Sequence, residues 1–325
     1  MKRASSRHAA GSIELKEGTG PITCMCPCGE FLEIYKIDKT FRLKTPEAID
    51  PKDTNPNAPW VISPVADVGS SNPIVARVLL QGFKILEAAV FNCDVDKEPI
   101  TRQLHSVKEA LLACEKLAKR VGGHIDSIIN IIKKHGLSKD NSGRALNPFP
   151  QVPDLEADCG TFLIQANRVI KLICALPRLF VKLDGSDTNF DHLWKRLERA
   201  VGKDSPLTEF VRNNAIMVRD LIELRNFHEH PKDIQTVIEN FHVDPSGKIQ
   251  VPSWRLVGKE VQEPIPIKED MYVTINFLIQ IAEEMLIHLV MECLSKQFHY
   301  NLVEVPDDKL DPKMPIKYRL SITLG

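Results

Sequence analysis

From Pro99 to Ile132 the sequence reads PITRQLHSVKEALLACEKLAKRVGGHIDSIINII, and one line of apolar or small residues runs through it in alternating steps of four and three. That line consists of Ile100, Leu104, Val107, Leu111, Cys114, Ala118, Val121, Ile125, Ile128 and Ile132. The alternation is typical of one buried stripe on a long α-helix. Gly122-Gly123 falls inside the segment and is a place where the helix can kink.

A second segment repeats the same alternation. Its stripe consists of Leu155, Cys159, Phe162, Ala166, Val169, Ile173, Leu176, Phe180 and Leu183. Pro177 should bend this helix without necessarily ending it. A loop rich in Gly, Asn and Pro, residues 136–153, joins the two segments, so we predict an antiparallel helical hairpin. A two-chain coiled coil is the rival interpretation, which the loop and the large Phe residues disfavour.

Shorter helices are expected on both sides of this hairpin. Asn72-Pro73 and Ser205-Pro206 each offer a capping side chain followed by proline at the first helical position. A helix over residues 190–201 should end at Gly202, and another should cover about residues 269–295.

The remaining segments favour extended structure. Residues 1–70 are rich in Pro, Gly, Asp and Asn, with short strands expected at 31–35 and 40–43, so we predict an irregular or small β N-terminal extension with a flexible start. Residues 236–256 predict a β-hairpin around the turn Asp244-Pro245-Ser246-Gly247. We therefore predict a mainly α protein: a helical bundle over residues 71–300 that carries this hairpin as an insertion, and an extended C-terminal tail over 301–325.

Composition restricts the class of protein. The chain has 325 residues, 43% of them hydrophobic and 26% charged, with a formal net charge of −1. This is typical of a soluble globular protein and argues against one that coats nucleic acid. A local basic surface is still allowed, because residues 102–203 hold 17 Lys and Arg against 11 Asp and Glu. Neither a signal peptide nor a membrane-spanning stretch is apparent, so we expect a cytoplasmic protein with no membrane partner.

Three of the eight cysteines lie close together, at Cys24, Cys26 and Cys28. Such a group invites a zinc interpretation. However, zinc ligands are usually separated by two or more residues, no second cysteine pair completes a set of four, and the nearest histidine in sequence is His8. We therefore expect no metal and no cofactor. The other five cysteines lie in apolar helical contexts, where a thiol acts as a small hydrophobic group.

The candidate for chemistry is Leu224-Arg225-Asn226-Phe227-His228-Glu229-His230-Pro231, where Arg225, Asn226 and His230 have the spacing Arg-Asn-x-x-x-His. The apolar line of the preceding helix places Arg225 at its next inward position, where a charged group needs a partner or a ligand. Pro231 disfavours helical geometry at His230, so the helix should fray there and let the ring swing towards Arg225. A histidine at a helix C-terminus suits proton transfer near neutral pH.

This spacing resembles the hallmark motif of the HEPN superfamily. The resemblance implies a HEPN-like bundle with two long antiparallel helices and an endoribonuclease that cleaves RNA without a metal. The RNA 2′-hydroxyl is then the nucleophile and the products end in a 2′,3′-cyclic phosphate. In that chemistry His230 takes the proton, Arg225 stabilises the phosphoryl charge, and Asn226 orients either the phosphate or His230. The resemblance also implies a homodimer, and a prokaryotic toxin or antiviral-defence effector with an antitoxin or regulatory protein as a further partner.

Three other interpretations stay open at this point. A HEPN module can bind RNA or a protein without cleaving. The chain can also be a purely structural helical protein. In the plainest interpretation, Arg225 pairs with Glu229 on a solvated helix end.

Overall fold

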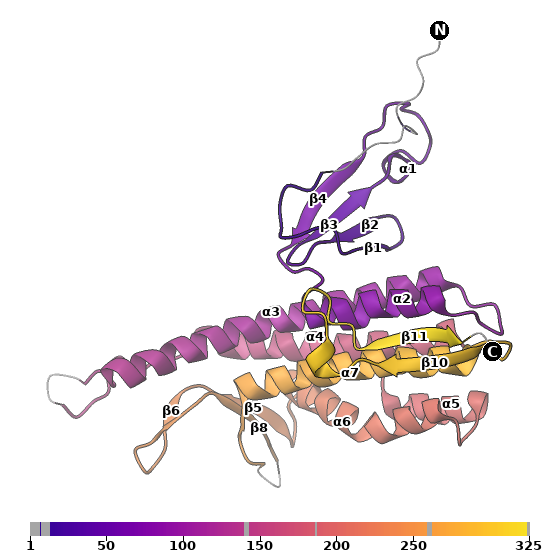
Figure 1. The fold of residues 1–325 in the computed structure, drawn as a ribbon. Helices are drawn as coiled ribbons and strands as arrows, with labels where there is room; N and C mark the ends of the chain where they lie inside the picture. The colour runs from indigo at the N-terminus through magenta and orange to yellow at the C-terminus, as the bar shows by residue number, and fades with distance from the viewer. Residues whose placement is uncertain (1–6, 8–13, 140–142, 186, 259–261, 324–325) are drawn as a thin grey trace. The chain divides into compact units, whose positions relative to one another are not determined.

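The computed structural model describes residues 7, 14–139, 143–185, 187–258 and 262–323 (Figure 1). These residues form two compact units. The first contains Met1–Lys108, Ala175–Leu183 and Ala282–Gly325, and the second contains residues 109–174 and 184–281. The start of the chain, which the sequence predicts to be flexible, lies outside the described residues except for Arg7.

The first unit opens with a four-stranded antiparallel sheet, in the order β1(Cys24–Pro27), β2(Leu32–Tyr35), β3(Thr40–Lys44) and β4(Val61–Ala66). One face of this sheet forms a small apolar core from Ile34, Phe41 and Leu43. The short helix α1(Pro46–Ile49) starts with proline and is capped by the side chain of Thr45. Expected strands 31–35 and 40–43 are confirmed as β2 and β3, whereas β1 and β4 were not predicted.

The longer helical segment that follows the sheet begins where Asn72-Pro73 predicts it. The Asn72 side chain accepts a hydrogen bond from the amide of Ile74 at 2.8 Å. A π-helical stretch, η2(Ile74–Leu80), then continues as α2(Gln81–Ala88). Near the C-terminus, β10(His299–Glu304) and β11(Tyr318–Thr323) pair as an antiparallel hairpin with η4(Asp307–Lys309) between them.

Two long helices run through the middle of the chain: α3(Lys97–His135) and α4(Leu155–Ala175). The first eight residues of the α3 stripe, Ile100 to Ile125, are all buried, and the helix continues through Gly122-Gly123 without a break. In α4 the α-helical bonding ends at Ala175, and a 3-10 turn, η3(Leu176–Leu179), follows because Pro177 has no amide hydrogen. Arg120 of α3 pairs with Asp158 of α4 in the second unit, so the two helices lie side by side there.

The second unit also contains α5(Phe190–Val201), α6(Pro206–Glu229) and the first part of α7(Ile267–Cys293). Two small sheets accompany them. One has the order β5(Gln235–Glu239), β8(Ser253–Val257), β9(Ile265–Pro266), and the other pairs β6(His242–Val243) with β7(Ile249–Gln250). The predicted turn at Asp244 is confirmed: its amide donates to the Lys248 carbonyl, and its carboxylate accepts from the amides of Ser246 and Lys248.

The predicted fold class is wrong. The structure is 50% helical and 17% strand, with seven α-helices and four small sheets among the described residues, so the protein is mixed α and β rather than a mainly α bundle with one inserted hairpin. The physical reason is that most of the added strands are short, so each carries little sequence signal. Proline in β1 and β4, and the two-residue length of β9, removed the alternating pattern that identifies a strand from sequence.

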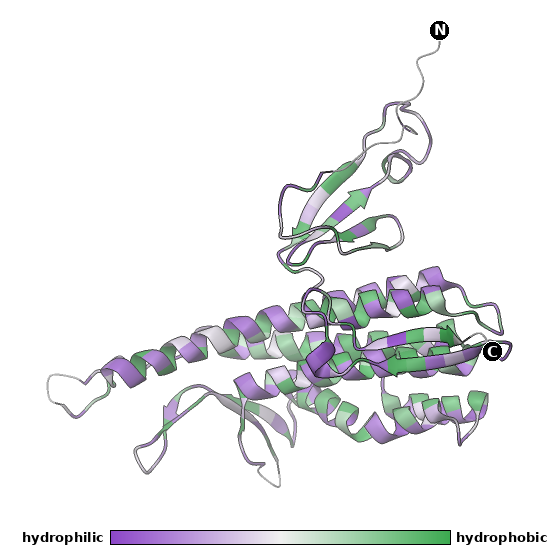
Figure 2. Ribbon diagram, viewed as in Figure 1, coloured by the Kyte–Doolittle hydropathy of each residue, from purple (hydrophilic) through white to green (hydrophobic). Residues whose placement is uncertain are grey.

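Two helical stretches, Leu155–Leu179 and Ile267–Cys293, are long and apolar enough to cross a membrane by length and composition. This corrects the expectation that no such stretch exists. However, most of each apolar window is buried inside the structure, as in the core helices of soluble proteins, so the evidence for a membrane is weak. Figure 2 shows the mixture of hydrophobic and hydrophilic residues along these helices.

Candidate functional site at the end of α6

Local sequence determines where α6 begins and ends. The Ser205 side chain accepts a hydrogen bond from the Leu207 amide at 3.2 Å, and Pro206 is the first helical residue. At the other end, His230 is the C-cap with φ −132° and ψ 62°, and its amide makes the last helical bond to the Asn226 carbonyl at 2.8 Å. The helix therefore ends at the residue before Pro231, as the sequence predicts.

Arg225 is held on both sides. Its Nη1 donates to Asn226 Oδ1 at 3.0 Å, and its other terminal nitrogen forms an ion pair with Glu229, one helical turn further on. The side chains of Arg225 and Glu229 are each 23% exposed. The Nε atom of Arg225 is buried and has no hydrogen-bond partner among the described residues. A buried N–H without a partner costs about 1–3 kcal/mol, so this guanidinium retains an unused donor.

His230 stands apart from Arg225. Its side chain is exposed, and no hydrogen bond or ion pair joins it to Arg225 within the described part of the chain. The helix geometry explains the separation, because residues five apart on an α-helix point about 140° away from each other. The structure therefore brings together Arg225 and Asn226 of the predicted site and leaves His230 as a separate, accessible imidazole at the same helix end.

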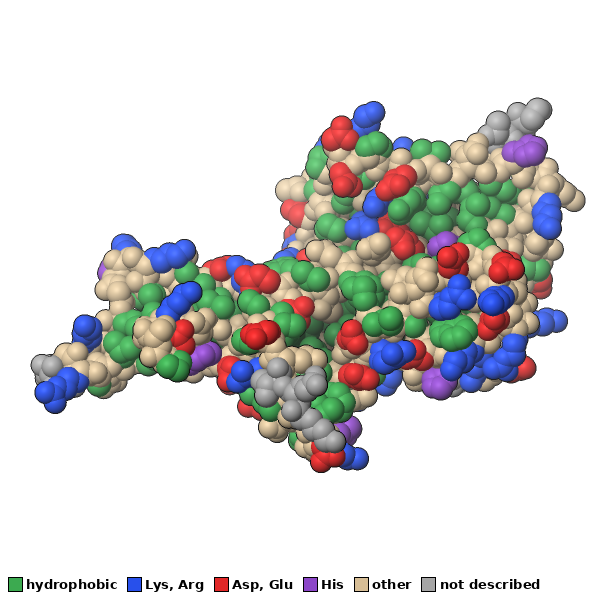
Figure 3. Space-filling model, turned by 90° about the horizontal axis from the view of Figure 1, so that it is seen from below, with side chains coloured by type: hydrophobic (Ala, Val, Ile, Leu, Met, Phe, Trp, Pro, Cys, Tyr) green, Lys and Arg blue, Asp and Glu red, His purple; other side chains and the backbone are tan. Residues whose placement is uncertain are grey.

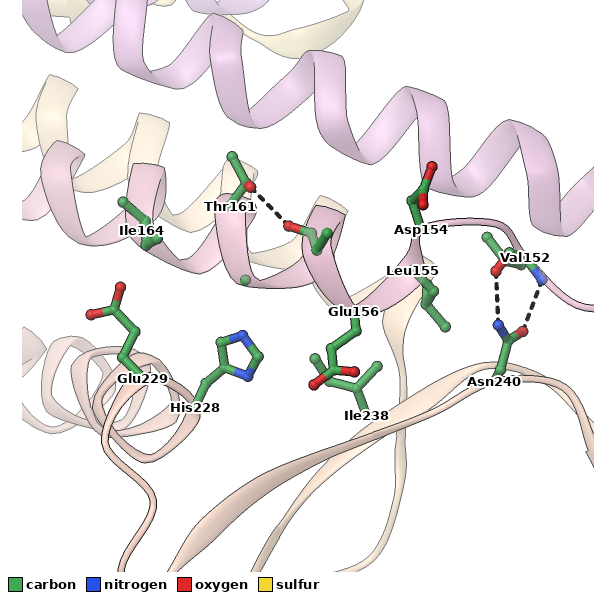
Figure 4. Close-up of a pocket in the computed structure, with 12 residues that line it drawn as sticks. Val152, Asp154, Leu155, Glu156, Thr161, Ile164, His228, Glu229, Ile238 and Asn240 are labelled. Atoms are coloured by element: carbon green, nitrogen blue, oxygen red, sulfur yellow. Dashed lines mark hydrogen bonds between the residues drawn. The ribbon is translucent and has the colours of Figure 1, made fainter.

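A pocket of about 760 Å³ lies beside this helix end, between α6, the start of α4 and strand β5 (Figure 4). His228 and Glu229 line it from α6, and Ile238 lines it from β5. The other lining residues are Val152, Asp154, Leu155, Glu156, Ala157, Gly160, Thr161, Ile164 and Asn240. Asn240 fixes the loop before α4, because its side chain bonds to both the amide and the carbonyl of Val152.

Gly160 makes the position of His228 possible. A Cβ placed on Gly160 would come 2.5 Å from Nε2 of His228, which is closer than real atoms approach. The imidazole therefore packs directly against the backbone of α4. The sequence does not single out Gly160 or His228, because nothing in either local sequence indicates that α4 and the end of α6 meet.

The pocket is acidic. Asp154, Glu156 and Glu229 line it with three carboxylates, and no Lys or Arg is among its lining residues. A phosphate inside it would be repelled, whereas a neutral base with amino donors or a cation would be favoured. On the face of the molecule drawn in Figure 3, acidic and basic side chains are interspersed with hydrophobic ones.

Comparison with known proteins found no relative of the chain. No family model, no curated protein and no solved structure matches it. The resemblance to the HEPN superfamily therefore depends on the Arg225, Asn226 and His230 spacing alone.

Proposed function

We propose that the chain is a metal-independent endoribonuclease that acts at the C-terminal end of α6. The observation that carries the proposal is the state of Arg225, a partly exposed guanidinium that Asn226 and Glu229 fix in position. Planar guanidinium groups bind phosphate through paired N–H donors. An exposed histidine follows one residue beyond the helix, where RNA can reach it.

The chemistry needs no metal, because RNA supplies the nucleophile. His230 removes the 2′-hydroxyl proton, the 2′-oxygen bonds to the adjacent phosphorus, and the bond from phosphorus to the 5′-oxygen breaks. The products are a 2′,3′-cyclic phosphate and a 5′-hydroxyl, whose oxygen takes up a proton. Arg225 stabilises the charge that develops on the phosphoryl oxygens, and Asn226 keeps the guanidinium in position.

In this proposal the phosphate and the base bind at different places, because the pocket is acidic. The scissile phosphate belongs at Arg225, outside the pocket, where its charge is matched. A neighbouring base fits the pocket, because the carboxylate of Glu156 can accept hydrogen bonds from exocyclic amino groups. Pockets of about 300–1,000 Å³ are the usual size for small-ligand sites, and the volume of this pocket, about 760 Å³, lies within this range.

A homodimer would supply a second imidazole. The leaving 5′-oxygen needs a proton. The histidine that removes the 2′-hydroxyl proton lies on the opposite side of phosphorus, so it is poorly placed to supply one. A two-fold copy would place a second His230 beside the 5′-oxygen. In support of such an interface, α6 exposes the apolar side chains of Ile216 and Met217, which are 63% and 53% accessible.

Incubation of the purified chain with total RNA tests the proposal. We expect cyclic-phosphate ends from the wild type, and loss of cleavage by at least about a hundredfold in His230→Ala and Arg225→Ala, as for removal of a catalytic proton acceptor or oxyanion donor. His192→Ala, which changes an exposed histidine on α5, is the matched control and should retain full activity. Cleavage that persists in His230→Ala would overturn the mechanism. RNA binding without cleavage in the wild type would instead favour a non-catalytic module.

A further inference from the structure

The N-terminal sheet has two different faces. Its strand register pairs Cys26 with Glu33 and Glu33 with Arg42, so these three residues form one row across β1, β2 and β3. The alternate residues, including Ile34 and Phe41, form the apolar core on the opposite face. The row is therefore a polar surface built on a sheet whose other face is an ordinary hydrophobic core.

Glu33 is the centre of this polar face and is completely buried. Its Oε1 lies 2.9 Å from both Arg42 Nε and His105 Nε2, and its Oε2 lies 2.7 Å from Lys108 Nζ. The hydroxyl of Tyr35 also donates to Oε2. His105 and Lys108 come from α3, more than seventy residues away in sequence, and all of these residues belong to the first unit.

Two cysteine thiols lie at the same place. Cys26 is fully buried and Cys28 is 5% exposed, and the Cys28 thiol is close enough to raise the pKa of the Cys26 thiol. The Sγ of Cys28, one ring nitrogen of His105 and a carboxylate oxygen of Glu33 all lie within 4.8 Å of one another. These thiols therefore do not occupy the apolar environment that buried cysteines usually prefer.

We infer that Cys26, Cys28, His105 and Glu33 form a binding site for a zinc-class divalent transition metal. Thiolate sulfur, imidazole nitrogen and carboxylate oxygen are the ligand atoms that zinc takes in proteins. With metal–ligand distances of about 2.0–2.3 Å, tetrahedral ligand atoms lie roughly 3.3–3.8 Å apart, so the ligand atoms of Cys28, His105 and Glu33 must approach one another by at most about 1.5 Å. The Cys26 thiol must move in beside Cys28 as the fourth ligand.

The charges of the site permit a dication in spite of the two basic residues nearby. Metal binding releases one proton from the Cys26 thiol and one from the Cys28 thiol. The dication adds two positive charges while the two protons leave, so the net charge of the site is unchanged. Arg42 and Lys108 continue to neutralise the Glu33 carboxylate, which has enough lone pairs for several partners. The phenyl ring of Phe31 covers His105 edge-on, with ring centroids 5.5 Å apart, and limits the access of water.

This inference replaces the sequence-based expectation of no metal. The sequence places three thiols together but offers no further ligand nearby. Glu33 reaches the site through strand pairing and His105 through the packing of α3, and local spacing reveals neither.

Metal analysis of the full chain tests the site. Protein purified under reducing conditions and loaded with Zn²⁺ should retain about one metal ion per chain after dialysis, and Co²⁺ should give the intense near-ultraviolet absorption of cobalt–thiolate bonds. Cys28→Ser and His105→Gln should lose this metal. Cys24→Ser, on the same strand but outside the ligand set, should retain it. Metal well below one per chain in wild-type protein, with no cobalt–thiolate band, overturns the inference whether or not the variants fold. Retention of the metal in a folded Cys28→Ser chain does so too.

Discussion

The Glu33 cluster and the end of α6 each contain a carboxylate paired with basic side chains, but the carboxylate is buried in the first and partly exposed in the second. At Glu33, a fully buried carboxylate has partners on both oxygens, supplied by distant parts of the first unit. Burial alone would raise the pKa of Glu33, but the hydrogen bond from His105 and the charge of Lys108 hold it well below its usual range. At the end of α6, Arg225 and Glu229 pair within one helical turn and are partly exposed, and Arg225 keeps an unused donor.

The two regions differ in what the removal of one partner costs. In a buried network the removal leaves an uncompensated charge. A partly exposed pair can exchange one partner for a substrate at low cost. The two regions should therefore respond very differently to the removal of one carboxylate.

The largest effect is expected for Glu33→Ala. This change leaves Lys108, which is 1% exposed, without its carboxylate, and loss of one partner from a buried pair costs about 3–5 kcal/mol. Urea unfolding of chelator-treated protein measures the cost without a contribution from metal. The double variant Glu33→Met with Lys108→Met should recover most of the loss, because it removes both buried charges. A loss below about 1 kcal/mol in the single variant would show that water already solvates this cluster.

A smaller effect is expected for Gly160→Ala, which tests how closely α4 meets the end of α6. Alanine normally stabilises a helix interior by about 1 kcal/mol relative to glycine. At Gly160 the added Cβ must displace His228, so we expect a net loss of about 1–3 kcal/mol. Gly123→Ala is the matched control. A Cβ at this position of α3 meets open space, so the variant should gain the full stabilisation that alanine gives to a helix interior. Equal gains in both variants would contradict the contact between Gly160 and His228.

Features that depend on adjacent residues were predicted from the sequence. Ser205-Pro206 and Pro231 define α6, and Gly202 ends α5, because capping and proline geometry act within a few residues. The Arg225 motif was found for the same reason. The stripe of α3 was also readable, since a long helix repeats its signal many times.

Features that depend on distant pairing were missed. Strand β1 contains only Cys24–Pro27, and its partner β2 determines which of its side chains meet Glu33. Similarly, His105 lies on α3, the helix whose apolar stripe the sequence predicts. No local pattern shows that His105 faces a carboxylate 72 residues earlier in the chain. The contact of Gly160 with His228 is of the same kind. Sequence spacing therefore located the candidate motif but neither the pocket nor the proposed metal site.

The smallest effect on stability is expected for Glu229→Gln, and it addresses the α6 end directly. Arg225 and Glu229 form a partly exposed pair four residues apart, and such pairs contribute about 0.3–0.5 kcal/mol to stability. The unfolding free energy should therefore hardly change, in contrast to the loss at Glu33.

The same substitution should strengthen the interaction with RNA, because a phosphate must otherwise compete with the Glu229 carboxylate for Arg225. Release from a competing pair of about 0.3–0.5 kcal/mol corresponds to roughly a twofold lower Kd for a short RNA that cannot be cleaved. Fluorescence anisotropy measures this Kd, and Glu209→Gln, an exposed carboxylate at the opposite end of α6, is the matched control. Unchanged or weaker binding in Glu229→Gln would mean that Arg225 serves only the helix end, and the plain interpretation of a solvated ion pair would then be preferred.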